Sequence, residues 1–259
     1  MKLKFALVSG QRQEAKPGLS GECPRCRNPV IAKCGEVKVW HWAHKQERAC
    51  DSWKENETEW HRTWKNEFPP EWQEVLHYAD DGEKHFADVK TGDDWVIEFQ
   101  HSPIKPEERR SRDAFYKKLI WVVDGLRQKR DKDQFLKAWG EGTPVGAQSP
   151  VRRAFSDDCR LLQEWSGSPG PVFFDFGEDR MLGWLLAKRP QGPVYIAPFP
   201  RAEFIEIHRQ TGTRMARDFD SFVEDLNELV DNYESHLRTQ GSNRFPPHSP
   251  PGRRRRRRF

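Results

Sequence analysis

The chain has 259 residues, a formal net charge of +4, 35% hydrophobic residues and five cysteines. This length allows one domain with appendages or two modest domains, and no apolar run approaches the roughly 20 residues that span a bilayer. The composition thus excludes an integral membrane protein. Because residues 1–8 are followed at once by Ser9-Gly10, we expect no signal peptide and predict a cytoplasmic protein with reduced thiols.

Residues 1–52 are short on helical periodicity and carry most of the cysteines. Cys23 and Cys26 flank a Pro-Arg pair, and two thiolates held by such a tight turn can grip one side of a tetrahedral Zn²⁺. A second pair of ligands from a later hairpin or loop would complete the site, and in so small a module the metal takes the place of a core. We therefore expect a zinc-finger-like module over residues 1–52.

The second pair of zinc ligands has more candidates than places. His41 and His44 lie three positions apart, so an extended strand would point them to opposite faces. The two sets that we expect are His41 with His44, or His44 with Cys50 in place of one histidine. The alternative is a cysteine-bearing β-element that holds no metal. The competing side chains are His41, His44, Cys34 and Cys50.

The first predicted helix covers residues 56–68, where Trp60, Trp64 and Phe68 repeat every four residues and form one apolar stripe. The helix ends at Pro69-Pro70. A neighbouring stripe on the same helix is polar and has the same spacing. Taken alone, such a row is equally typical of a solvated helix edge. Its members are Glu57, His61 and Lys65.

A hairpin is predicted over residues 86–100, with its turn at residues 91–94. The alternation of side chains in the second strand places Glu98 and Gln100 together on one face. A three-residue loop in the turn would put Asp88 opposite Glu98 on that same face, whereas a register shifted by one residue would separate the two acids. A metal site needs the first register. In the alternative reading, both acids are ordinary solvent-facing strand residues.

The elements around the hairpin give the order helix, strand, hairpin, helix, strand and helix. A strand precedes it at residues 71–79, and a helix follows at residues 107–119, with Arg109, Arg110 and Arg112 near its start. Residues 120–124 form a continuous apolar run that is typical of a buried strand, and residues 131–139 predict a further helix.

Glycine and proline at residues 140–144 mark a boundary, beyond which no chemical motif occurs. We predict a separate C-terminal α+β domain of unknown role over residues 150–239 and a disordered arginine-rich tail over residues 240–259. The six arginines at positions 253–258 exceed the net charge, so the rest of the chain is slightly acidic. The tail could bind phosphates, or it is a solvated or non-native end. The elements expected in the C-terminal domain are a helix at 155–165, a hairpin at 172–186, a strand at 194–197 and a helix at 221–237.

Taken in order, the motifs of residues 20–125 resemble the PD-(D/E)xK nuclease superfamily and, more specifically, the CoiA-like competence proteins. A single Asp…Glu-x-Gln arises often by chance, but the ordered set is far more specific. The motifs are Cys23/Cys26, His41-Trp42-Ala43-His44, Glu57…His61…Lys65, Ala87-Asp88-Val89, Glu98-Phe99-Gln100, Ser102-Pro103-Ile104, Arg112 with Tyr116, and Trp121-Val122-Val123-Asp124.

The resemblance implies an α/β fold with a restriction-endonuclease-like core over residues 53–140, in which a mixed central sheet is flanked by helices. It also implies a metal-dependent DNA nuclease that hydrolyses phosphodiester bonds in DNA processing, competence, recombination or defence. Asp88, Glu98 and Glu57 would hold Mg²⁺ or Mn²⁺, joined by the backbone carbonyl of Phe99. Zn²⁺ would be structural.

Gln100 stands where most members of the superfamily carry lysine. Its amide can bond to water and phosphate but brings no charge, so His61 and Lys65 would supply the missing positive charge. Flanking DNA phosphates would be held through sequence-independent contacts with the arginines of the following helix. These arginines are Arg109, Arg110 and Arg112.

Two other functions are compatible with the sequence. Gln100 also supports a non-catalytic DNA-binding accessory protein with a nuclease-like fold, and a zinc-stabilised interaction protein could dock a partner on residues 150–239. DNA is the expected partner, and the oligomeric state, monomer or homodimer, stays open. A cluster of tryptophans near the zinc module would stack on bases or, as is more common, pack the module. These are Trp40, Trp42, Trp53 and Trp60.

Overall fold

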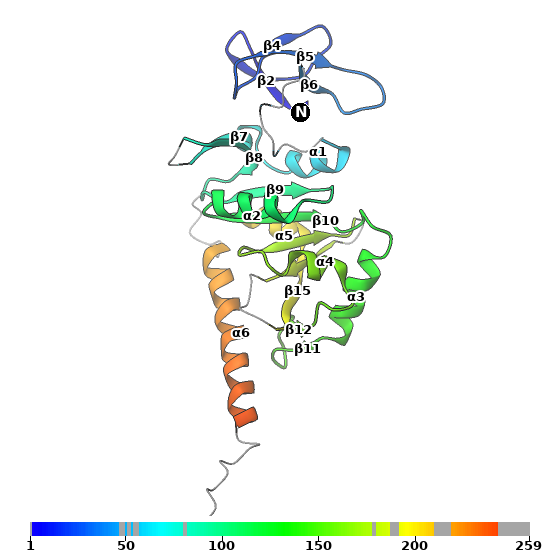
Figure 1. The fold of residues 1–259 in the computed structure, drawn as a ribbon, viewed down its shortest axis with the longest axis vertical. Helices are drawn as coiled ribbons and strands as arrows, with labels where there is room; N and C mark the ends of the chain where they lie inside the picture. Colours follow the sequence, from blue (N-terminus) through cyan, green and yellow to red (C-terminus); the bar gives the residue numbers. More distant parts are fainter. Residues whose placement is uncertain are drawn as a thin grey trace, which may run out of the picture.

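The computed structural model describes residues 2–46, 50, 53, 57–79, 82–177, 180–186, 192–209 and 219–242. These residues form two sheets, with the N-terminal sheet at one end of the molecule and the last helix projecting from the other (Figure 1). The predicted tail beyond residue 242 and part of the expected turn after Gly177 lie outside the described residues. No helix in the described part of the chain is long and apolar enough to cross a membrane.

The N-terminal sheet has six strands in the order β1-β6-β5-β4-β2-β3, and its strand pairs are antiparallel. Leu3, Val30 and Trp42 are completely buried in it and supply a small apolar core. The six strands are β1 (Lys2–Leu3), β2 (Phe5–Val8), β3 (Gln11–Glu14), β4 (Ser20–Glu22), β5 (Pro29–Lys33) and β6 (His41–His44).

The second sheet has nine strands in the order β11-β12-β15-β14-β13-β10-β9-β8-β7. Its centre is parallel, since β10 pairs in parallel with both β9 and β13, and the outer strands pair antiparallel. The nine strands are β7 (Gln73–Tyr78), β8 (Lys84–Lys90), β9 (Val96–Gln100), β10 (Leu119–Asp124), β11 (Thr143–Pro144), β12 (Arg152–Ala154), β13 (Val172–Asp175), β14 (Met181–Leu185) and β15 (Val194–Pro200).

Helices cover both faces of the large sheet, because side chains of the central strands alternate between two apolar cores. Ile120 and Val122 of β10 pack in the core under α1, α5 and α6, whereas Trp121 and Val123 pack in the core under α2, α3 and α4. The helices are α1 (Glu59–Asn66), the short 3₁₀ helix η1 (Pro70–Trp72), α2 (Pro106–Phe115), α3 (Asp131–Glu141), α4 (Arg160–Trp165), α5 (Arg201–Arg209) and α6 (Phe219–Ser242).

The structure differs from the predicted domain division at residues 140–150. The strands that follow this stretch do not form a sheet of their own, because β13 pairs in parallel with β10 and continues the same sheet. Phe173 and Trp184 from the C-terminal half share one core with Trp64 and Val122 from the first half. Residues 59–242 therefore form one continuous packing unit within the described segments.

Polar contacts from residues 4–12 of the N-terminal sheet join it to the start of β7 in the large sheet. The backbone N–H groups of Lys4 and Phe5 donate to Oε2 of Glu74 at 2.9 and 3.3 Å. The buried ammonium of Lys4 donates to Oε1 of Gln73 at 2.7 Å, and Arg12 donates to backbone carbonyls around the start of β7. The module is thus fixed beside β7 rather than tethered by a linker alone.

Candidate functional site

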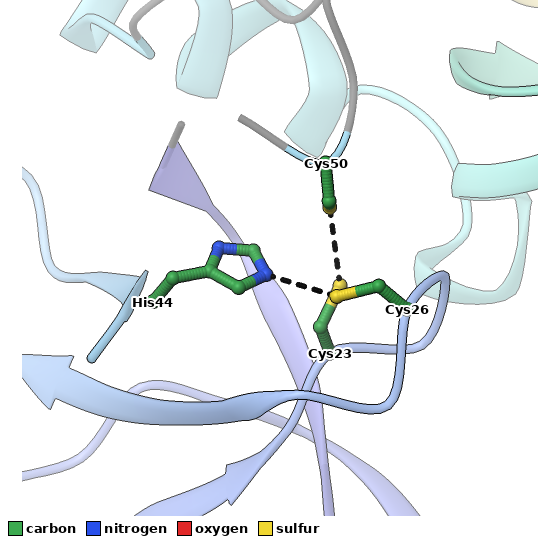
Figure 2. A group of neighbouring side chains, drawn as sticks. All are labelled: Cys23, Cys26, His44 and Cys50. Carbon is green, nitrogen blue, oxygen red and sulfur yellow. Dashed lines mark hydrogen bonds between the residues drawn. The ribbon is translucent and has the colours of Figure 1, made fainter. Parts of the chain in front are cut away.

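Three cysteines and one histidine of the N-terminal module meet at one point. The ligand atoms of Cys23, Cys26, His44 and Cys50 all lie within 4.8 Å of one another, and among the described residues this is the group whose geometry suits a metal ion. Sγ of Cys23 lies 3.7 Å from Sγ of Cys50, and Sγ of Cys26 lies 3.3 Å from Nε2 of His44. Figure 2 shows His44 and Cys50 converging on the turn that carries the other two cysteines.

The turn between β4 and β5 presents Cys23 and Cys26 to the same side. The backbone N–H of Arg27 donates to the carbonyl of Cys23 at 2.9 Å, and Arg27 has a φ of 59°, which closes the turn. The hydrogen bond between the two thiols lowers the pKa of Cys23 and raises the pKa of Cys50, so the pair favours one shared proton and one thiolate. In a tetrahedral site with Zn–S bonds of about 2.3 Å, sulfur atoms lie roughly 3.8 Å apart, which the Cys23–Cys50 distance matches.

The structure chooses between the two predicted sets of zinc ligands. His44 and Cys50 join the first pair, whereas His41 lies outside the group, with its Nδ1 2.8 Å from the carbonyl oxygen of Val39. The reason is the one foreseen in the sequence: both histidines lie on β6, three residues apart, and such positions face opposite sides of a strand. Cys34 also lies outside the group. A set of three cysteines and one histidine is a common composition of structural zinc sites.

In the large sheet, three acidic residues form a row across neighbouring strands. In the register of β7 with β8, Gln73 pairs with Val89 and Val75 pairs with Ala87, so Glu74 lies opposite Asp88. The register of β8 with β9 ends where Val89 faces Ile97, so Asp88 and Glu98 are the next residues of these strands. This is the register that a metal site requires. Like charges directly opposite one another destabilise a sheet, so the row needs compensation.

Beyond Val89 the ladder between β8 and β9 is replaced by contacts from the acids. The backbone N–H of Asp88 donates to Oε1 of Glu98 at 3.2 Å, and the backbone N–H of Phe99 donates to Oδ2 of Asp88 at 3.1 Å. The two carboxylates therefore bridge the strands at the point where their main chains separate.

Lys65 compensates one end of the acid row. Its ammonium is almost completely buried and lies 2.9 Å from Oε1 of Glu57, 3.1 Å from Oε1 of Glu74 and 3.6 Å from Oδ1 of Asp88. Burial opposes the charge, but the carboxylates of Glu74, Glu57 and Asp88 outweigh it and raise the pKa of Lys65. Glu57 lies just before α1, outside the helix predicted to include it, and Lys65 of α1 is the residue that reaches Asp88.

Glu57 is held by two cations. Arg62 donates from Nε and Nη2 to both carboxylate oxygens of Glu57, at 3.1 and 2.8 Å, and its Nη2 also donates to the carbonyl of Trp40 in the N-terminal module. Burial favours the neutral acid, but the charges of Lys65 and Arg62 outweigh it and lower the pKa of Glu57. Glu57 is therefore a carboxylate at neutral pH.

Arg112 compensates the other end of the row. Its Nη1 donates to Oε2 of Glu98 at 2.9 Å, while Nη2 donates to Glu108 and to the carbonyl of Trp53. Gln100 is buried, and its amide donates to the carbonyl of Ser102 at 2.7 Å. Glu98 and Gln100, which the sequence places on one face of β9, are thus both buried, and Arg112 is the direct partner of Glu98.

The other predicted basic and histidine residues have different surroundings. Arg109 is buried and donates to the carbonyl of Glu164 at the end of α4, whereas Arg110 is exposed beside Glu107. His61 caps α1: its Nδ1 accepts from the backbone N–H of Thr58 at 3.3 Å, and the backbone N–H of His61 donates to the Thr58 hydroxyl. Of the three α2 arginines, Arg110 is the one that solvent reaches.

The tryptophans near the module are mainly packing residues. Trp42 is completely buried, Trp53 stacks on His85 with ring centroids 3.4 Å apart, and Trp60 donates to Asp175 at 2.9 Å. Trp40 is the exposed one, with 46% of its surface accessible.

Sequence reasoning missed Glu74 and Arg62. Glu74 has a φ of 46°, a left-handed conformation that costs a non-glycine residue of order 1 kcal/mol or more, and its two oxygens contact Lys65 and the N-terminal module. The register of the first strand with the hairpin was the signal that could have found it. Arg62 belongs to neither of the two predicted stripes of α1, and nothing in the helical pattern distinguishes it.

Comparison with known protein families gives one match. Residues 18–52 match the family model of the N-terminal domain of the competence protein CoiA. The matched segment contains the whole cysteine and histidine group, so the match supports a CoiA-like relationship for this module. No curated protein and no solved structure matches the chain.

Proposed function

We propose that this protein is a metal-dependent DNA nuclease that hydrolyses phosphodiester bonds. The observation that carries the proposal is the acid row, in which Asp88 and Glu98 meet at the separation of β8 from β9. Helices on the two sides deliver the buried bases Lys65 and Arg112 to these acids. The order α1, β7, β8, β9, α2 and β10 is the order expected for a PD-(D/E)xK core and supports the proposal.

The carboxylate and carbonyl oxygens of the acid row are the type of donor that a hard divalent cation prefers, although among the described residues only the cysteine and histidine group is already gathered within ligand distance. Asp88 and Glu98 would hold Mg²⁺ or Mn²⁺ with the carbonyl of Phe99, and Glu57 would contact the ion directly or through water. The carboxylates of the cluster (Glu57, Glu74, Asp88 and Glu98) outnumber its cations (Arg62, Lys65 and Arg112), so negative charge is left over for an ion. When bound, such an ion supplies charge to the scissile phosphate and acidifies a water molecule.

The protein's own residues would orient the reactants. Lys65 contacts the carboxylates of Glu57, Glu74 and Asp88, and its charge helps to lower the pKa of Glu57, so that this acid is ionised as a hard cation requires. Gln100 would hydrogen-bond the attacking water or a phosphate oxygen, and the exposed Arg110 would contact a neighbouring phosphate of the DNA.

The N-terminal module would hold a structural Zn²⁺ and support the acid row. Its contact with Glu74 and the bond from Arg62 to Trp40 couple the module to the cluster. The CoiA match of residues 18–52 supports a competence-related role. DNA would be the partner of the proposed nuclease.

A non-catalytic DNA-binding role is the second candidate, and one observation favours it. Lys65 already lies between the carboxylates where a cation would bind, and Glu98 is already paired with Arg112. If these internal pairs are not opened by substrate, the site would bind DNA without cutting it.

Cleavage of supercoiled plasmid and single-stranded DNA, with Mg²⁺ or Mn²⁺, tests the proposal. We expect the wild-type protein to nick DNA and the Asp88→Ala and Glu98→Ala variants to lose at least about 100-fold in rate. Asp93→Asn is the matched control, because Asp93 is an exposed acid in the turn of the same hairpin. The control should cut at the wild-type rate.

The outcomes separate the two candidates. Equal cutting by wild type and both alanine variants would show that the cleavage comes from elsewhere and would overturn the proposal. Metal-independent DNA binding by all variants, with no cleavage by any of them, would establish the accessory role.

A further inference from the structure

A carbonyl group in the loop after β9 holds the side chain of Gln100. This loop covers residues 101–105 and joins β9 to α2. Nε2 of Gln100 donates to the carbonyl of Ser102 at 2.7 Å, and this bond sets the rotation of the amide. The directions of its second N–H and of its carbonyl oxygen are set with it. The orientation of Gln100 therefore depends on the orientation of the Ser102 carbonyl.

An arginine from another part of the chain contacts the same carbonyl. Nη1 of Arg127 donates to the carbonyl of Ser102 at 3.0 Å. A carbonyl oxygen has two lone pairs, so it can accept from Gln100 and from Arg127 together. The Ser102 carbonyl is thus the point at which Arg127 meets Gln100.

Arg127 is in turn held by a carboxylate of α4. Its side chain is 4% exposed, and its Nη2 donates to Oε1 and Oε2 of Glu164 at 2.8 and 2.6 Å. Trp165, the next residue of α4, packs in the core that includes Val96 of β9, and alternation along β9 puts Gln100 on this same face. The two terminal nitrogens of one guanidinium therefore connect α4 to the loop that holds Gln100.

A second contact fixes the loop to the turn that carries Arg127. This turn joins β10 to α3, and in it the backbone N–H of Leu126 donates to Oδ1 of Asp124 at 2.8 Å. Oδ2 of Asp124 lies 2.7 Å from Nδ1 of His101, the first residue of the loop. The turn thus contacts two neighbouring residues of the loop, so the loop and the turn are positioned together.

We propose that Arg127, held by Glu164, positions Gln100 for phosphodiester hydrolysis. This inference rests on the proposed nuclease function, in which Gln100 hydrogen-bonds the attacking water or a phosphate oxygen. Such a bond depends on direction, and a displacement of about 1 Å can cost on the order of 10²-fold in rate. Arg127 acts through the Ser102 carbonyl and not on the reactants. The C-terminal half of the chain would thus contribute to the site of cleavage through α4.

An Arg127→Met variant removes both contacts and keeps a long side chain. The carboxylate of Glu164 keeps a partner, because Nη1 of Arg160 donates to its Oε2 at 2.6 Å, so we expect the variant to fold. Its kcat should fall about 10–100-fold while its KM for DNA stays within about twofold of wild type. Arg127→Lys replaces the planar fork by a single ammonium and should recover only part of the lost rate.

Arg152→Met is the matched control. Nη1 of Arg152 also donates to a backbone carbonyl, that of Gly142, at 2.9 Å. Its strand, β12, is separated from β9 by four other strands of the sheet. The control loses the same kind of contact and should cut DNA at the wild-type rate.

A double-mutant cycle with Gln100→Ala separates positioning from general support of the fold. If Arg127 acts through Gln100, Arg127→Met should slow the wild-type protein but not the Gln100→Ala protein, so the two losses do not multiply. A residue that only supports the fold would slow both proteins by the same factor.

The Gln100 amide can also be observed without metal or DNA. Its side-chain signal in an amide NMR spectrum is identified by its disappearance in Gln100→Ala. We expect Arg127→Met to shift this signal and to speed its hydrogen exchange, and Arg152→Met to leave it unchanged.

The outcomes distinguish this inference from the proposed function. Wild-type protein that does not cut removes both. Cutting by Arg127→Met at the wild-type rate, equal losses in the wild-type and Gln100→Ala backgrounds, or an unchanged Gln100 signal would each overturn the inference and leave the nuclease.

Discussion

The N-terminal module gathers three thiols and an imidazole around one point, whereas the large sheet gathers carboxylates around buried lysine and arginine side chains. The soft ligands of the module have the spacing of a metal site, and an ion from outside would hold them together. The acids of the large sheet are already paired with Lys65 and Arg112, so we expect this sheet to fold without a metal. A metal ion bound there would share the carboxylates with Lys65. We therefore expect the N-terminal module to need a metal for its stability and the acid row to need one only for activity.

Loss of a zinc ligand should have the largest effect. We expect Cys50→Ser to lose zinc and to unfold the N-terminal sheet, because the binding of a structural zinc contributes about 10 kcal/mol or more to such modules. Cys34→Ser, in the same module but outside the group, should keep both. Bound zinc measured by elemental analysis, with thermal melting, gives the readout. Retention of zinc by Cys50→Ser would contradict the assignment.

Removal of the buried cation comes next. Lys65→Met should destabilise the protein by about 3–5 kcal/mol, because the carboxylates around Lys65 lose their partner. Mg²⁺ should recover part of this loss in the variant and add little to wild type. Lys137→Met removes an exposed pair with Asp158 and should cost less than about 1 kcal/mol. Urea unfolding measures both. Equal losses would mean that the row needs no internal cation.

A buried histidine in the C-terminal helices must be separated from both centres in any acid titration. Burial lowers the pKa of His208 to about 4, while its Nδ1 lies 2.7 Å from the carbonyl of Phe204. The unfolded chain binds this proton near pH 6.5, so the folded state loses about 3 kcal/mol as pH falls from about 6.5 to 4. His208→Leu should flatten that part of the profile measured by urea unfolding. An unchanged profile would show that His208 is not its source.

The smallest effect concerns the segment that joins the two centres. Thr58 caps α1 shortly after Cys50, and Thr58→Ala should cost about 0.5–2 kcal/mol. Thr63→Ala, an exposed change on the same helix, should stay within about 0.5 kcal/mol. If the two variants melt alike, the cap does not set the start of α1.

The sequence predicted the acid pair because its determinants are local. A three-residue turn, which gives one of the two registers that the sequence left open, aligns Asp88 with Glu98. The predicted helix from residue 56 begins instead at Glu59, so Glu57 reaches Lys65 from outside the helix and not through its four-residue spacing. Glu74 escaped because its φ of 46° departs from the regular strand that period-two reasoning assumes.

Nonlocal contacts explain the other differences. Strand alternation separates His41 from His44, but the position of Cys50 beside Cys23 is a tertiary contact that sequence spacing does not determine. The predicted separate C-terminal domain is wrong because β13 pairs in parallel with β10, and this pairing joins residues 51 positions apart, such as Asp124 and Asp175. Apolar runs such as that of β13 indicate a buried strand but not its neighbour.

The most direct test measures zinc content and DNA cleavage in the same preparations of wild type, Asp88→Asn and Cys50→Ser. We predict one zinc per chain and Mn²⁺-dependent cutting for wild type, the same zinc without cutting for Asp88→Asn, and neither for Cys50→Ser. Undiminished cutting by a zinc-loaded Asp88→Asn protein would contradict the central claim that the acid row of the large sheet is the site of cleavage.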